Sequence, residues 1–114
     1  MQVNYINKKV KERFSPEFSN KWDYPDNIKE KMLALENAMV EAENLYDISC
    51  LPQYRFHRLE GKRKDEWSLS VGRKYRVTLI PCDEQEKYIK EGDILAKCKS
   101  ITIVEITEVS KHYE

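Results

Sequence analysis

The sequence predicts an α+β protein in which two N-terminal helices pack on one face of a mainly antiparallel sheet of four to five strands. Two observations support this fold class. A long helical pattern of apolar residues lies in the first half of the chain, and the two-residue alternation typical of strands begins at Trp67. The length of 114 residues is that of one ordinary domain, so we expect residues 1–114 to form a single domain.

The helical signal is strongest over residues 27–46. Asn27 followed by Glu30 predicts a capping box at the start of this helix. Apolar residues then recur at alternating steps of four and three, which places them on one face of a helix of about five turns. They are Ile28, Met32, Leu35, Met39, Ala42 and Tyr46. A shorter helix is expected upstream, with Asn7 as its N-cap and Phe14 near its end.

The alternation that begins at Trp67 predicts an antiparallel hairpin. A three-residue loop at 72–74 pairs Leu69 with Val77 and keeps every apolar side chain on one face, whereas a two-residue loop would mix the faces. The remaining predicted pairs are Val71 with Tyr75 and Trp67 with Leu79. Because the helices must cover the Trp67 face, the opposite face should be open and polar. That face carries Ser68, Ser70, Arg76 and Thr78.

Three further segments complete the expected fold. Residues 101–107 are apolar on both sides, which is typical of a strand in the middle of a sheet. Tyr54–Leu59 is expected to form an additional strand. The acidic stretch 83–100 is assigned only as a helix or an extended hairpin, with Gly92 as the expected helix stop.

Composition excludes several classes of protein. Hydrophobic residues make up 40% of the chain and charged residues 35%, which argues against extended disorder. No apolar run approaches the roughly 18 residues of a membrane span and no signal peptide is evident, so a cytoplasmic protein is expected. Cys50, Cys82 and Cys98 are odd in number and lack metal-ligand spacing, which predicts buried, reduced thiols.

The charges are unevenly distributed although their sum is zero. Residues 54–82 carry eight basic and three acidic side chains, a local charge of +5. The acidic side chains outnumber the basic ones on both sides, nine to seven in residues 1–53 and eight to five in residues 83–114. Such a local basic region in a neutral protein suits an anionic partner such as a nucleic acid.

The same basic region carries a more specific pattern. It is a strand ending in His-x-Leu-x-Gly, then basic residues, Trp-Ser, an alternating strand and an aromatic-Arg pair. The matching residues are His57, Leu59, Gly61, Arg63, Trp67, Ser68, Tyr75 and Arg76. This pattern resembles that of the HigB toxins, the plasmid-maintenance killer proteins of the RelE/ParE superfamily, and the His112-Tyr113 pair near the C-terminus is similar to the His/Tyr cluster of that family.

The resemblance implies a RelE-like fold and a toxin of a type II toxin–antitoxin pair. Toxins of this kind cleave translated mRNA on the ribosome, and the reaction needs no metal or other cofactor, because the 2′-hydroxyl attacks its own neighbouring phosphate. The expected partners are a helix-turn-helix antitoxin similar to HigA, mRNA and the ribosome, and operator DNA through the antitoxin. No membrane partner is expected.

Site residues follow from the resemblance position by position. His57 is the candidate general acid or base, and Arg76 is the candidate for stabilising the phosphate, since guanidinium presents a fork of donors. His112 and Tyr113 are candidates for proton transfer or base stacking. The cations expected to bind the RNA backbone are Lys62, Arg63, Lys64, Arg73, Lys74 and Lys111. Trp67 is expected in the core instead.

Two departures from the family pattern keep other functions open. Glu60 stands where the family usually has a lysine, and residues 110–113 read Ser-Lys-His-Tyr where many members have Asp-Tyr-His. One alternative is a ParE-like inhibitor that binds DNA gyrase. Another is a catalytically silent member that binds only the antitoxin and operator DNA.

Overall fold

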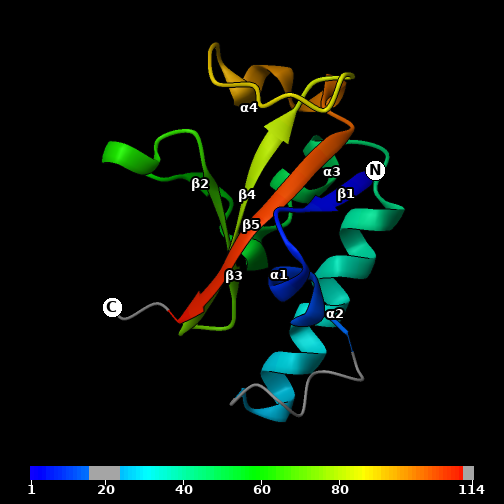
Figure 1. The fold of residues 1–114 in the computed structure, drawn as a ribbon, viewed down its shortest axis with the longest axis vertical. Helices are drawn as coiled ribbons and strands as arrows, with labels where there is room; N and C mark the ends of the chain where they lie inside the picture. The colour runs from blue at the N-terminus through cyan, green and yellow to red at the C-terminus, as the bar shows by residue number, and fades with distance from the viewer. Residues whose placement is uncertain (16–23, 112–114) are drawn as a thin grey trace.

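The computed structural model describes residues 1–15 and 24–111, and its centre is a five-stranded sheet with strand order β1-β5-β4-β3-β2 (Figure 1). The strands are β1 (Gln2–Tyr5), β2 (His57–Arg58), β3 (Trp67–Val71), β4 (Tyr75–Cys82) and β5 (Ile103–Lys111). Only the β1–β5 pair is parallel among these five strands. The predicted α+β class and the mainly antiparallel sheet are thereby confirmed.

The described segments also contain four α-helices. They are α1 (Lys8–Glu12), α2 (Asp26–Glu41), α3 (Leu45–Ser49) and α4 (Ile94–Lys97), with 3-10 turns η2 (Pro52–Tyr54), η3 (Gly61–Arg63) and η4 (Cys98–Ser100). Buried residues of α1, α2 and α3 share one hydrophobic core with the alternate apolar residues of β3 and β4. No helix within residues 1–15 and 24–111 is long and apolar enough to cross a membrane.

The β3–β4 hairpin has the predicted register. Leu69 pairs with Val77, and the loop between the strands spans residues 72–74. Gly72 in this loop has a φ of +67°, a left-handed conformation that glycine adopts without steric cost. β5 lies between β1 and β4, so the expectation of a central strand near residues 101–107 is also confirmed.

The long helix is shorter than the apolar stripe predicts. Ala42 leaves the helical conformation, with a ψ of 145°, and Asn44 accepts a hydrogen bond from the Asp47 amide to start α3. The prediction of one helix to residue 46 is therefore wrong, because this N-cap satisfies backbone donors of a new helix. Tyr46, expected on the buried stripe, is 44% exposed.

The predicted cap of the long helix is also wrong, whereas the cap of the short helix is confirmed. The residue before the first turn of α2 is Pro25, and no side-chain cap hydrogen bond forms there, so Asn27 lies inside the helix. In α1, the Val10 amide donates to the Asn7 side chain at 2.9 Å, as expected of an N-cap.

The weaker strand and loop predictions need further corrections. The strand expected at Tyr54–Leu59 shrinks to β2, because Arg55 has a left-handed φ of 46° that interrupts extended backbone. In the acidic stretch, Gly92 does not end a helix. It precedes α4, which begins at the N-cap Asp93. β1 was not expected at all.

Two of the three cysteines lie where the sequence places them. Cys82 and Cys98 are buried, and burial raises the pKa of the Cys82 thiol to about 11. Cys50 is exposed, so the prediction of a buried thiol is wrong there. It follows the short helix α3 at the point where the chain turns outward.

Candidate functional site

Two rows of polar side chains cross the sheet on the face opposite Trp67. Directly paired residues of neighbouring antiparallel strands point to the same face. The first row runs from β2 to β5 and consists of His57, Ser68, Thr78 and Glu108. The second row consists of Ser70, Arg76 and Ser110. The two rows bring a histidine and an arginine from separate strands onto one face.

A cavity of about 540 Å³ lies at the β2 and hairpin end of these rows. Its lining residues are Arg55, Phe56, His57, Ser68, Ser70, Gly72, Arg73, Tyr75 and Arg76. Three guanidinium groups and one imidazole thus surround it, and no acidic side chain is among the lining residues. The charge of the cavity therefore suits an anion such as a phosphate group.

Arg76 is the best placed cation in this cavity. Its side chain is partly buried, and its Nε has no hydrogen-bond partner among the described residues. Ser110 Oγ, in the same row, is likewise buried and unpartnered within that part of the chain. A buried donor without a partner costs about 1–3 kcal/mol, so a ligand that accepts from it recovers this free energy.

His57 is oriented by the backbone beside it. Its Nδ1 lies 2.7 Å from the Arg55 carbonyl oxygen. Because a carbonyl can only accept, Nδ1 carries the proton in this contact, and Nε2 of the neutral ring is left to take one. The left-handed conformation of Arg55 brings its carbonyl to this position, and such a conformation costs a non-glycine residue about 1–3 kcal/mol.

Arg63 has a different environment from the one its expected role requires. Its Nε donates to Glu66 Oε2 at 2.7 Å, and its Nη2 donates to Glu108 Oε2 at 2.9 Å. Thr107 Oγ1 also donates to Glu66, at 2.7 Å. The hydrogen bond from Arg63 lowers the pKa of Glu66 and raises the pKa of Arg63. The Arg63 charge is thus compensated by carboxylates.

The polar face is consequently not open along its whole length. Thr78 Oγ1 lies 2.9 Å from Thr107 Oγ1, and Thr78 is fully buried, while Ser68 is 2% exposed. The expectation of an open face is wrong for these two residues, and the contact with Thr107 contributes to the burial of Thr78. Ser70 and Arg76 are partly exposed and line the cavity, so the polar face is open at these two residues.

The remaining predicted site residues divide into three groups. Arg73 lines the cavity with His57 and Arg76, and Lys74 is exposed in the same hairpin loop. Lys62 and Lys64 are exposed near η3 and do not line the cavity. Lys111, at the end of β5, pairs with Tyr75 and so points to the Trp67 face, not to the face that carries Arg76. His112 and Tyr113 lie outside the described residues.

Arg55 was missed by the sequence analysis although it lines the cavity and supports His57. The only available signal was a basic residue two positions before the pattern histidine. Trp67 lies in the core, as expected. Its ring stacks on Phe56 at 4.7 Å between centroids, with the Arg58 guanidinium 5.1 Å from its centre.

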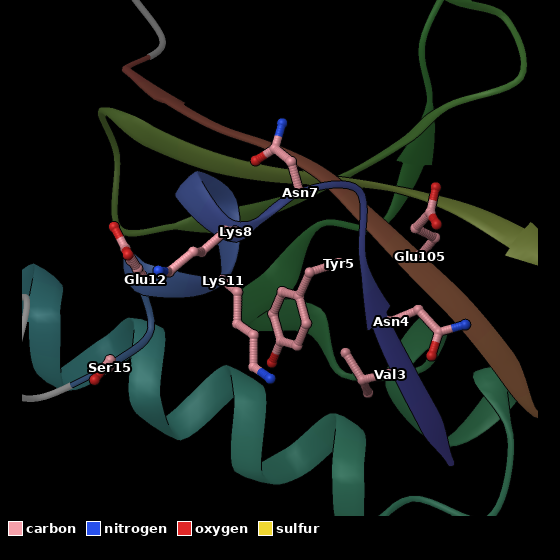
Figure 2. A pocket seen from close by; sticks show the side chains of 9 residues that line it. All are labelled: Val3, Asn4, Tyr5, Asn7, Lys8, Lys11, Glu12, Ser15 and Glu105. Carbon is pink, nitrogen blue, oxygen red and sulfur yellow. The ribbon is translucent and has the colours of Figure 1, made fainter.

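A larger hollow of about 900 Å³ lies between β1, α1 and β5, and Figure 2 shows the side chains that line it. It combines cations of α1, Lys8 and Lys11, with the carboxylates of Glu12 and Glu105. Mixed charge of this kind selects no ligand class, and none of the predicted site residues that the structure describes lines this hollow. Among the described residues, no group of three or more His, Cys, Asp or Glu side chains is arranged to hold a metal ion.

The fold matches that of a known bacterial toxin. The YoeB/ParE toxin from Agrobacterium tumefaciens superposes on it with a TM-score of 0.53 and 15% sequence identity, over 99% of this chain and 100% of the toxin chain. No curated protein sequence gives a significant match. The architecture is therefore that of the RelE/ParE-type toxins.

The family model of the HigB-like toxins, described as the RelE-like toxin of the type II toxin–antitoxin system HigB, matches residues 4–91. This span covers most of the chain, from β1 to the acidic stretch, and includes both the His57 and the Arg76 strands. The chain belongs to the HigB-like toxin family, which is the family that its sequence pattern resembles. A type II toxin has an antitoxin as its partner.

Proposed function

We propose that this toxin is a ribosome-dependent, metal-independent mRNA endoribonuclease that acts in the cytoplasm, and that its catalytic site is the 540 Å³ cavity. The observation that carries the proposal is the unpartnered Arg76 Nε in a cavity that His57 shares and that no acidic side chain lines. A phosphodiester supplies the missing acceptor and the negative charge that these groups lack.

The proposed reaction uses the RNA's own 2′-hydroxyl. His57 Nε2 takes the hydroxyl proton while the 2′-oxygen bonds to phosphorus, and the bond from phosphorus to the 5′-oxygen breaks. The products are a 2′,3′-cyclic phosphate and a 5′-hydroxyl, so the leaving oxygen must gain a proton. His112 and Tyr113 remain the proposed donors. Arg76 stabilises the charge that develops on the phosphoryl oxygens.

The other proposed RNA contacts differ in strength. Arg73 and Lys74 border the cavity or its loop and can bind the flanking backbone. Lys62 and Lys64 are exposed, make no ion pair with another described residue and can contact more distant phosphates, whereas Arg63 must leave Glu66 or Glu108 to do so. We therefore assign Arg63 a smaller share of RNA binding than its position in the pattern suggests.

The partner is proposed to be a helix-turn-helix antitoxin that also binds operator DNA. It would oppose toxicity by covering or distorting the cavity. The gyrase-inhibitor alternative predicts a different outcome in bacterial cells that express the toxin. Supercoiling of plasmid DNA would change, while mRNA would stay intact.

The test is cleavage of a defined mRNA in a reconstituted translation reaction with Arg76→Gln, His57→Gln and the control Arg58→Gln. Arg58 neighbours His57 in β2 but lies over Trp67 on the other face. We expect losses of about 10²-fold to 10³-fold for Arg76→Gln and about 10²-fold to 10⁴-fold for His57→Gln. Activity of both variants equal to that of Arg58→Gln would refute the proposed site.

A further inference from the structure

A second hollow of about 360 Å³ adjoins the proposed catalytic cavity. The residues common to both are Arg55, Ser70, Gly72 and Arg73. The second hollow adds Lys31 and Ala34 of α2, Gln53 and Tyr54 of η2, and Val71 of β3. The two spaces therefore share a wall at the hairpin loop, and the second one reaches the long helix.

The chemistry of the second hollow is again cationic. Lys31, Arg55 and Arg73 contribute three positive charges, and its lining includes no carboxylate. None of these three side chains forms an ion pair with any other residue of the described ranges. Gln53 adds an amide that both donates and accepts, and Tyr54 adds an aromatic ring. Cations beside an aromatic ring and an amide suit one nucleotide of a single strand.

Lys31 reaches the junction of the two spaces. A β-carbon placed on Gly72 would lie 3.8 Å from Lys31 Nζ and 3.0 Å from Ile28 Cδ1. The absence of a side chain at Gly72 thus allows α2 to approach the hairpin loop closely, and the Lys31 ammonium group lies near Gly72, which precedes Arg73 in the loop. Arg73 borders both spaces.

We propose that the second hollow binds the nucleotide next to the scissile dinucleotide on the same RNA strand, with Lys31 contacting the phosphate that joins this nucleotide to the dinucleotide. The proposal rests on the proposed nuclease function of the first cavity. The four lining residues that the two spaces share favour one strand that contacts both over two separate ligands. Tyr54 and Gln53 then face the base of the flanking nucleotide.

The experiment compares uncleavable 2′-O-methyl RNAs of two and six nucleotides, with dissociation constants measured by NMR titration at several salt concentrations. The variant is Lys31→Gln, and the matched control is Lys29→Gln. Lys29 belongs to the same helix but lies two positions away, where it pairs with Asp26 at 3.9 Å.

We expect Lys31→Gln to weaken hexanucleotide binding about three- to fivefold, as for loss of one exposed ion pair, and to leave dinucleotide binding unchanged. The slope of log K against log salt should fall in magnitude by about 0.7 for the hexanucleotide, because one phosphate contact is lost. A Lys31→Gln protein that matches Lys29→Gln, or that loses affinity for both lengths equally, would overturn the inference.

Two further outcomes distinguish a failure of the flanking-nucleotide site from a failure of the proposed catalytic cavity. If Arg76→Gln weakens dinucleotide binding while Lys31→Gln behaves like its control, only the flanking-nucleotide site is wrong. If Arg76→Gln leaves both RNAs bound as in the unmodified protein, the proposed catalytic cavity is wrong. A Lys31→Gln effect on binding to empty ribosomes alone would assign Lys31 to ribosomal RNA and would also overturn the inference.

Discussion

Glu66→Gln tests whether the carboxylate cluster around Arg63 stabilises the fold. The Glu66 side chain is 17% exposed and accepts from Arg63 Nε at 2.7 Å, from Arg63 Nη2 at 3.1 Å and from Thr107 Oγ1 at 2.7 Å. Glutamine keeps the shape of the side chain and one acceptor oxygen but removes the charge. Hydrogen bonds to charged groups contribute about 1.5–3 kcal/mol.

The lower end of that range applies here. Arg63 is 35% exposed and keeps Glu108 as a second partner, so solvent and the remaining ion pair offset part of the loss. We expect a decrease in the free energy of unfolding of about 1.5 kcal/mol at pH 7. For a domain of this size, that loss corresponds to a fall in Tm of about 5 to 10 °C.

The loss should depend on pH in a defined direction. Arg63 lowers the pKa of Glu66 in the folded protein below its ordinary value of 4.5. The stability that the carboxylate contributes is therefore present above about pH 4.5 and is lost as the pH falls through the folded-state pKa. Glutamine does not titrate, so the gap between the two proteins should be widest at neutral pH and should narrow in acid.

Thermal unfolding followed by circular dichroism between pH 3 and pH 7 measures this gap. Glu60→Gln is the matched control, since Glu60 is exposed and makes no ion pair with another described residue. A Glu66→Gln protein with the Tm of the control at pH 7, or a gap that widens as the pH falls, would refute the reasoning.

Two further substitutions test the packing and capping arguments. Leu35→Ala removes a fully buried side chain of α2 and should lower the free energy of unfolding by about 2–5 kcal/mol in urea titrations. The control is Val40→Ala on the same helix. Because Val40 is 54% exposed, this change should alter the free energy of unfolding by less than about 0.5 kcal/mol. Equal effects of the two would show that α2 is not packed as described. Asn7→Ala removes the N-cap of α1 and should cost about 1 kcal/mol in the same titration, and an unchanged midpoint would mean that the cap contributes nothing to global stability.

The parts of the fold that the sequence predicted depend on local pattern. The hairpin register followed from the alternation of Leu69, Val77 and their neighbours, because a shift of one residue would turn the apolar face to solvent. β1 has only four residues and pairs with β5 at the other end of the chain, so no local pattern identifies it. The break after α2 depends on Asn44, which is the N-cap of α3. The apolar stripe continues past this residue to Tyr46, so the pattern alone predicts one unbroken helix.

The site was predictable to a similar extent. The alternation placed Arg76 on the polar face, and the family resemblance identified His57 as a candidate for the same site. Both residues line one cavity. The pairing of Arg63 with Glu108 joins residues 45 positions apart, which residue spacing does not reveal. Arg55 acts through its backbone carbonyl, and a carbonyl carries no side-chain signature in the sequence.

The parallel pairing of β1 with β5 bears on when this toxin becomes complete during its own synthesis. A ribosome makes the chain from the N-terminus at about 5–20 residues per second, so Gln2 emerges long before its partner Ile103. β5 also supplies Ser110 to the Arg76 row and Glu108 to Arg63. A nascent chain that still lacks β5 thus has no partner for β1 and neither of its polar rows complete, so the sheet surface forms only after β5 has left the ribosome.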